Sequence, residues 1–132
     1  MPHQRHNPDT LYRGSRSYYS QIVESTGTRQ WHIAGMVPLT PERVVVGEND
    51  MAAQAKQVMH NIGLALQAVG ATPAHVVRIN IYTTDMERFL TEGRPLVYSF
   101  FGDNPPASTL LGVNRLADTK YLVEVEVTAV SD

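Results

Sequence analysis

Residues 104–130 read NPPASTLLGVNRLADTKYLVEVEVTAV, a stretch with two strand-like apolar segments on either side of a polar turn. After the double proline, which cannot continue a helix, residues 107–113 form the first segment. Residues 121–130 alternate strictly, because successive side chains of a strand point to opposite sides of its sheet. On one face lie Val123, Val125 and Val127, and on the other lie Leu122, Glu124 and Glu126. We therefore predict two strands joined by a turn at residues 117–120, which together make a terminal antiparallel hairpin.

The composition indicates a single globular domain. A chain of 132 residues can bury about two-thirds of its unfolded surface without a metal or disulfide. Its net charge of −2 offers no basic stripe for phosphates, so nucleic-acid binding is not expected. The absence of cysteine excludes thiol nucleophiles, disulfides and thiolate metal sites, and is typical of a reducing cytoplasm. Neither a signal peptide nor a membrane span is expected, because no sufficiently long apolar run is present.

The N-terminal third predicts a polar segment followed by three short strands. Residues 1–16 lack a periodic apolar pattern, so we expect a flexible lead-in, with the single domain at residues 17–132. His3 and His6 lie in this lead-in without a nearby carboxylate cluster, and we expect no metal site there. The expected strands are residues 18–24, 30–34 and 44–46, the first two forming a hairpin.

The middle of the chain predicts two helices around a fourth strand. From residue 50 to residue 69, apolar side chains recur every three or four positions, which indicates a helix capped by Asn49 or Asp50 and ended by Gly70. Residues 76–83 form the strand. A second helix at residues 86–101 is interrupted by Gly93 and Pro95, so we expect a kink or a short helix that begins near Arg94.

This element order, βββαβαββ, predicts an α+β domain of two layers, with both helices on one face of a mostly antiparallel or mixed sheet. The valine-rich faces of the long strands would meet the helices. The opposite, open face would carry Arg78, Asn80, Tyr82, Leu122, Glu124 and Glu126, together with Trp31 or His32. Such a mixed face is either solvated or covered by another subunit, and the residues alone leave both alternatives open.

Four segments of the chain are read together: GMVPLTPE from Gly35, AAQAKQVMHNIGLALQAVGATPAHVVRINIYTTDM from Ala52, FFGDNPPAST from Phe100 and YLVEVEVTAV from Tyr121. In order and spacing they resemble the signatures of the RidA family, also called YjgF. The resemblance covers about residues 18–130. It implies a chorismate-mutase-like fold that assembles as a homotrimer, with small-molecule clefts between neighbouring subunits.

The resemblance also implies a chemistry. Archetypal members hydrolyse reactive imines and enamines, such as 2-aminoacrylate and its imine tautomer, to 2-oxo acids and ammonia, without a metal or organic cofactor. In those members an arginine in a P-A-R-S motif binds the substrate carboxylate bidentately. Here the motif is Pro106, Ala107, Ser108 and Thr109, so serine replaces that arginine. Losing a charge-assisted pair predicts about ten- to hundredfold weaker handling of 2-imino acids. Arg115 matches a different loop arginine and is expected to form a turn-side salt bridge.

By the same resemblance, Glu124 corresponds to the glutamate that orients the attacking water, and Glu126 is the second choice. Tyr19 matches the tyrosine that closes the cleft, and Gly35 matches a glycine that lets the backbone approach a ligand closely. We expect Tyr19, Gly35, Ser108 and Glu126 to bind substrate and Glu124 to act in catalysis.

Three functions remain open at this point. The first is deamination of an imine or enamine other than 2-iminopropionate, by a cytoplasmic hydrolase. The second is a non-catalytic trimer that binds or senses a metabolite in the same cleft, which the missing arginine favours. The third is endoribonuclease activity, which the negative net charge and the lack of a histidine and lysine pair placed for acid and base catalysis disfavour.

Overall fold

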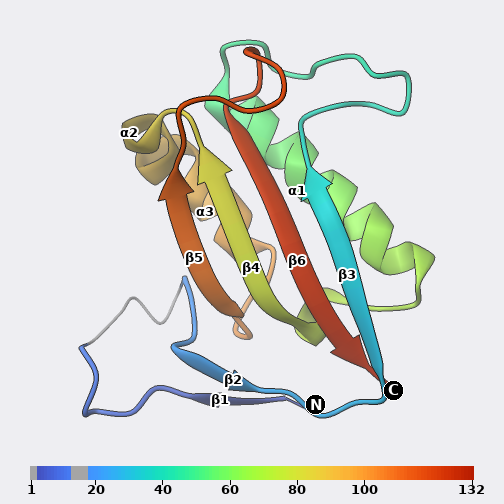
Figure 1. Ribbon diagram of the computed structural model, residues 1–132, viewed down its shortest axis with the longest axis vertical. Coiled ribbons are helices and arrows are strands. Elements are labelled where there is room, and N and C mark those ends of the chain that lie inside the picture. The colour runs from blue at the N-terminus through green and yellow to red at the C-terminus, as the bar shows by residue number, and fades with distance from the viewer. Residues whose placement is uncertain (1–2, 13–17) are drawn as a thin grey trace.

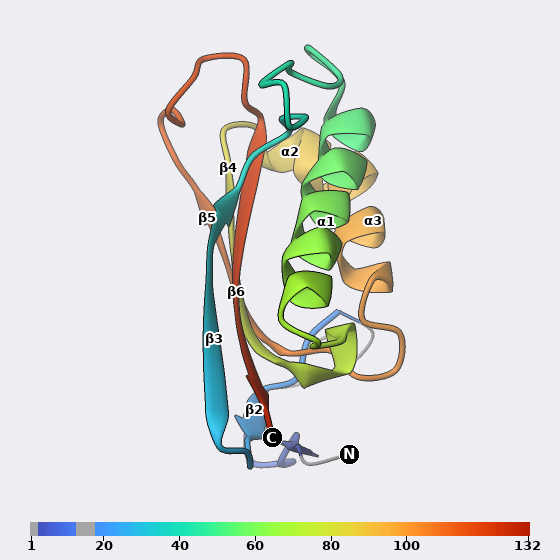
Figure 2. The same ribbon diagram turned by 90° about the vertical axis from the view of Figure 1, so that its right-hand side faces the viewer.

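The structure, a computed structural model, describes residues 3–12 and 18–132. One layer is a sheet of four strands in the order β3-β6-β4-β5, and the other layer consists of helices that cover one face of it (Figures 1 and 2). The predicted two-layer α+β architecture with a mixed sheet is therefore correct. A separate pair of short strands, β1 and β2, lies beyond one end of the sheet (Figure 1).

The first helix, α1, extends over Met51–Ala68, as its apolar periodicity predicts. The Asp50 side chain caps it by accepting a hydrogen bond of 3.0 Å from the amide of Ala53. Gly70 follows its end with a φ of 72°, a left-handed conformation that suits glycine. No helix in the described part of the chain is long and apolar enough to cross a membrane.

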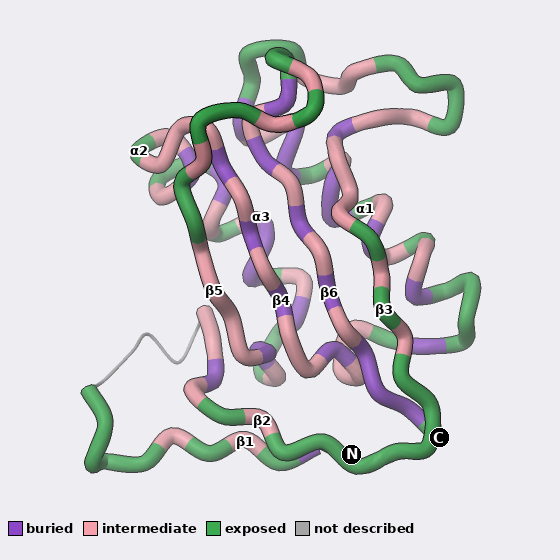
Figure 3. The backbone as a smooth tube through the Cα atoms, viewed as in Figure 1, coloured by how far each residue is buried: buried purple, intermediate pink, exposed green. Residues whose placement is uncertain are grey.

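The central strands β4 (Val76–Thr83) and β6 (Val123–Ser131) pair in antiparallel orientation. Their alternation is visible as a regular exchange of buried and half-buried positions along both strands (Figure 3). The side chains of the core face are fully or almost fully buried, as predicted, and those from these strands are Ile79, Ile81, Val123, Val125 and Val127. A bulge between Val76 and Arg78 shifts the register, so that Val76 rather than Val77 is buried.

The predicted terminal hairpin is wrong. Strand β5 (Ala107–Gly112) does not pair with β6 but lies parallel to β4, at the edge of the sheet. A parallel pair needs a crossover connection, and the helices between β4 and β5 supply it. The partner of β6 on its other side is β3 (Arg29–Met36), which is antiparallel to it.

The N-terminal strands also differ from the prediction. Strand β1 (Gln4–His6) falls inside the expected lead-in and pairs with β2 (Ile22–Glu24) in antiparallel orientation. The expected hairpin between residues 18–24 and 30–34 would pair β2 with β3, and the described strand pairs do not include that pair. The expected strand at residues 44–46 is reduced to a single bridge between Leu39 and Val45. Residues 1, 2 and 13–16 of the lead-in lie outside the described residues.

The second helical region has three parts: α2 (Met86–Arg88), a π-helical turn η2 (Phe89–Gly93) and α3 (Arg94–Ser99). A short 3₁₀ turn, η1 (Pro73–His75), precedes β4. The start of α3 at Arg94, with proline in its first turn, confirms the predicted interruption. The Asp85 side chain caps α2 by accepting a hydrogen bond of 3.2 Å from the amide of Arg88.

Candidate functional site

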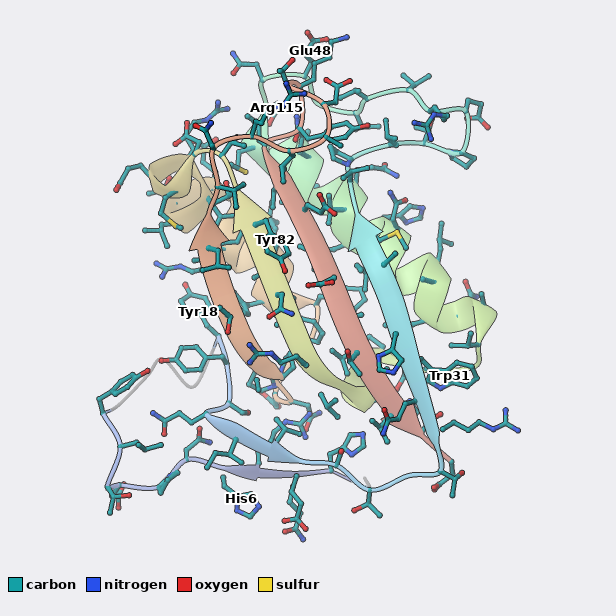
Figure 4. The ribbon with its side chains drawn as sticks, in the orientation of Figure 1. His6, Tyr18, Trp31, Glu48, Tyr82 and Arg115 are labelled. Atoms are coloured by element: carbon teal, nitrogen blue, oxygen red, sulfur yellow. The ribbon has the colours of Figure 1, made fainter. Side chains whose placement is uncertain are left out.

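A set of polar side chains that includes two carboxylates lies on the open face of the sheet, on the side away from the helices. The register places Asn80 opposite Glu126 and Tyr82 opposite Glu124. Side chains at paired positions of neighbouring strands lie on the same face, so these four polar groups form one cluster. Figure 4 shows the Tyr82 side chain projecting from β4 on this face. We call Glu124, Glu126, Asn80 and Tyr82 the carboxylate cluster.

Glu126 is held in place by its neighbours in the carboxylate cluster. Its Oε1 accepts a hydrogen bond of 2.6 Å from the Tyr82 hydroxyl and one of 3.2 Å from the Asn80 amide. The hydrogen bond to Glu126 raises the pKa of Tyr82, because ionisation of the phenol would remove the donated proton and place two negative charges together. Glu126 is therefore held in a fixed position as a hydrogen-bond acceptor.

Glu124 has the opposite environment. Among the described residues it has no hydrogen-bond partner, and burial, followed by the nearby Glu126 charge, raises its pKa above the ordinary glutamate value. Its carboxylate lies directly over Gly35 of β3, so close that a Cβ atom at residue 35 would be 1.9 Å from Oε2. A glycine at this position is what allows the carboxylate to occupy this place. A carboxylate with a raised pKa and no fixed partner is suited to accept a proton.

His32 rather than Trp31 faces the open side of β3. Trp31 packs against the hydrophobic core and donates a hydrogen bond of 2.9 Å from Nε1 to the Ser131 hydroxyl. His32 is exposed and lies opposite Thr128 of β6. The choice that the sequence left open is thereby resolved by the register of β3.

A pocket of about 230 Å³ lies at the edge of the sheet beside β5. We call it the edge pocket, and the residues that line it are Leu11, Tyr12, Tyr19, Ser20, Gln21, Arg78 and Ser108. The segment with Tyr19 is attached to the start of β5 by backbone and side-chain bonds from Ser20, including one of 2.6 Å from its hydroxyl to the carbonyl of Pro105. The pocket therefore combines aromatic and hydroxyl groups with one cationic group.

Ser108 borders the edge pocket, but its hydroxyl is already paired. It lies 2.7 Å from the hydroxyl of Tyr98, a side chain of α3 that is only 5% exposed. In the parallel register Ser108 is opposite Ile79, whose side chain belongs to the core face. Burial raises the pKa of Tyr98, so the Tyr98 phenol stays neutral. Ser108 thus has a structural partner on the helix side of the sheet.

The five predicted site residues fall into two groups. Glu124, Glu126 and Gly35 are together on the open face, whereas Tyr19 and Ser108 border the edge pocket. The lining of the edge pocket includes Tyr19 and Ser108 but none of the three residues on the open face. The sequence placed Asn80 and Tyr82 on the open face without assigning them a role, and it gave none to Tyr98; their hydrogen bonds depend on strand register, which periodicity does not determine.

Other residues considered from the sequence have structural roles. Arg115 does not form the expected salt bridge: it donates to the carbonyls of Leu116 and Ala117 within its own loop, at 3.0 and 3.1 Å. His3 lies 2.9 Å from the carbonyl of Val130, and His6 pairs with Glu24 at 3.0 Å. Within residues 3–12 and 18–132, no group of three or more histidine or acidic side chains is placed to hold a metal ion.

Comparisons with known proteins relate this arrangement to one family. The family model described as Endoribonuclease L-PSP matches residues 13–131. The chain is 34% identical over 114 residues to Protein DfrA of Myxococcus xanthus, a match that covers 86% of this chain and 85% of that protein. It is 32% identical over 112 residues to a RutC family protein of Pyrococcus horikoshii, with 84% and 85% covered.

Solved structures show the same likeness in three dimensions. A Yersinia pestis protein of unknown function, YyfB of the conserved Rid family, superposes with a TM-score of 0.90 at 33% identity, covering 98% of this chain and 99% of that one. The YjgF gene product of E. coli superposes with a TM-score of 0.70 at 25% identity, covering 86% and 88%. The arrangement of sheet and helices described above is thus shared with these proteins.

Proposed function

Because the chain belongs to the Endoribonuclease L-PSP family, which includes the proteins called RidA and YjgF, we propose that it hydrolyses a reactive imine or enamine other than 2-iminopropionate. The observation that carries this proposal is Glu124. Its carboxylate lies over Gly35, has no partner among the described residues and has a raised pKa. These properties suit a group that accepts a proton from water.

The reaction has two steps at one carbon atom. In the first, Glu124 takes one proton from a water molecule while the water oxygen bonds to the imine carbon, and this proton passes to the imine nitrogen, which gives a carbinolamine. In the second, Glu124 takes the carbinolamine hydroxyl proton and returns it to the nitrogen as the carbon–nitrogen bond breaks, so that ammonia leaves and a carbonyl compound remains. An enamine first gains a proton at carbon and loses one from nitrogen to become the imine. Burial is the main cause of the raised pKa of Glu124, and the negative charge of Glu126, which Tyr82 and Asn80 hold in place, raises it further.

We also propose that the active form is a homotrimer in which neighbouring copies cover the open sheet face. The support is the composition of that face, which combines the half-buried carboxylate cluster with the exposed apolar side chain of Leu111, opposite Tyr82. Removing apolar area from water contributes about 25 cal/mol per Å², which favours such an assembly. Sedimentation of the purified protein at several concentrations tests this, and a monomer throughout would contradict it.

The catalytic proposal is tested by ammonia release from imines and enamines that are generated enzymatically in the assay. We expect acceleration that is lost in Glu124→Gln, by about a hundredfold or more if the carboxylate acts as general base. Glu42→Gln is the matched control, because Glu42 is an exposed glutamate away from the sheet face. The proposal fails if a broad panel of substrates shows no acceleration, or if Glu124→Gln retains the activity of the control.

One observation favours a second candidate, a metabolite-binding trimer without catalysis. Ser108 stands where the resemblance predicts a carboxylate-binding arginine, and its hydroxyl is paired with Tyr98. A protein of this kind would bind 2-oxo acids or their analogues in calorimetry and release no ammonia from any imine. Ammonia release that depends on Glu124 would exclude this candidate.

A further inference from the structure

We propose that Arg78 binds a carboxylate of the ligand in the edge pocket, in place of the arginine that is absent at Ser108. This inference rests on the proposed function, since it assigns a carboxylate to the substrate of that same protein. Its basis is that Arg78 and Ser108 line one pocket although they come from different strands.

The register of the parallel strands explains how Arg78 reaches the pocket. Arg78 lies opposite Ala107 at the start of β5, and its side chain is on the open face, next to that of Thr109. The guanidinium donates a hydrogen bond through Nη2 to the Thr109 hydroxyl. Because β5 is the edge strand, this contact directs the guanidinium across β5 toward the edge pocket. The side chain is therefore anchored at one nitrogen and directed to the pocket.

The charge of Arg78 is available for a ligand. No carboxylate of the described residues lies within ion-pair distance of it, and Thr109 is its side-chain hydrogen-bond partner within that part of the chain. A guanidinium has five N–H donors in a planar fork that matches a carboxylate, so donors remain after the bond to Thr109. None of its nitrogen atoms is both buried and unpaired, which means that they are accessible to a ligand.

Arg94, a second arginine near this edge, has a different environment. Its guanidinium lies over the Tyr18 ring, 4.7 Å from the centroid, and its Nε is buried without a partner. It does not line the edge pocket. Tyr19, Ser20 and Gln21 also line the pocket and supply hydroxyl and amide groups that can hold the remainder of a small polar ligand. The pocket therefore has one cation and several neutral polar groups, the composition expected for a small monocarboxylate.

Calorimetric titration with pyruvate and with its neutral amide, pyruvamide, tests the proposal. Pyruvate is unreactive in the hydrolysis, so binding is measured apart from turnover. We expect the unsubstituted protein to bind pyruvate more tightly than pyruvamide. Arg78→Gln should weaken pyruvate binding about ten- to hundredfold and leave pyruvamide binding unchanged. Arg78→Lys keeps the charge but not the planar fork, and should give an intermediate affinity.

The matched control is Arg29→Gln, which removes an exposed arginine at the far end of β3. It should bind pyruvate like the unsubstituted protein, and thermal melting should show that all variants are folded. The proposal is overturned if pyruvate binds no more tightly than pyruvamide, or if Arg78→Gln and Arg78→Lys both retain the original affinity. Ammonia release with unchanged pyruvate affinity in Arg78→Gln would refute this inference alone. Pyruvate affinity that depends on Arg78, without ammonia release from any imine, would refute only the catalytic proposal.

Discussion

Replacement of Gly35 by alanine should abolish activity with little effect on stability. A Cβ atom at residue 35 would lie 1.9 Å from Oε2, 2.8 Å from Cδ and 3.1 Å from Cγ of Glu124, and two atoms that are not bonded cannot approach this closely. The backbone at Gly35 accepts alanine, because Gly35 does not have a positive φ. The side chain of Glu124 must therefore rotate away.

The energies of this change nearly cancel. Moving Glu124 from its preferred rotamer costs about 0.5–1.5 kcal/mol. Replacing glycine by alanine reduces the conformational freedom of the unfolded chain, which contributes about 0.4–1 kcal/mol to stability. The melting temperature should thus change by only a few degrees, since about 1 kcal/mol corresponds to about 4 °C in a domain of this size. Activity should fall about a hundredfold or more, because the displaced carboxylate no longer accepts the proton of water.

The assay compares ammonia release with thermal melting for Gly35→Ala and for the control Gly63→Ala. In α1 a Cβ atom at residue 63 would be 3.6 Å from Phe100, an ordinary contact, so the control should be active and somewhat more stable. If Gly35→Ala is as active as the control, the Glu124 carboxylate over Gly35 is not the catalytic proton acceptor. If Gly35→Ala is inactive because it is unfolded, the close approach has a structural role instead.

Three further predictions concern side chains of the open sheet face, and each is measured on purified variants. Glu124 has a raised pKa, so the folded protein binds this proton more tightly than the unfolded chain and loses stability as the pH rises above the unfolded value of about 4.3. Glu124→Gln should therefore resist urea better than the unsubstituted protein at neutral pH and lose that advantage below about pH 4; equal resistance at both pH values would contradict the raised pKa. Tyr82→Phe removes the 2.6 Å bond to Glu126 and should lower the free energy of unfolding by about 1 kcal/mol in urea titrations, whereas no change would mean that water replaces this bond. Inactive Arg78→Gln and Glu124→Gln proteins, unfolded and refolded together, should regain part of the activity if one site takes each residue from a different copy, and a mixture that stays inactive would place both in one chain.

The elements that could be predicted from the sequence are those whose two faces have different environments. The helix α1 and the strands β4 and β6 each bury one face. Their apolar residues therefore recur with a period of 3.6 residues in the helix and 2 residues in the strands, and this period can be recognised in the sequence. The same alternation placed Glu124 and Glu126 on the open face. The short strands β1 and β2 expose most of their residues, and no period distinguishes such segments from a loop.

Strand pairing was predicted less well because it is not local. The hairpin of residues 104–130 was inferred from two strands that are consecutive in the sequence, but the sheet places β4 between them. The sequence did contain a signal for the correct pairing. A strand, a helical region and a strand follow one another from β4 through α3 to β5, and this succession is the unit that makes a parallel pair. The neighbourhood of Arg78 and Ser108 depends on that parallel register, so the candidate carboxylate site could not be predicted from the residues alone.

The separation of Arg78 from Glu124 is an argument for a site shared between copies. Glu124 lies opposite Tyr82, which is four residues beyond Arg78 on β4, and at about 3.3 Å per residue this is about 13 Å along the strand. The Arg78 guanidinium is directed over β5, whereas Glu124 belongs to β6 on the other side of β4, which increases the distance. In a 2-imino acid the carboxylate carbon and the imine carbon are bonded to each other, about 1.5 Å apart. Such a molecule is small compared with the separation of these two strand positions, so if both side chains act on it, we expect Arg78 to come from one copy and Glu124 from a neighbouring copy.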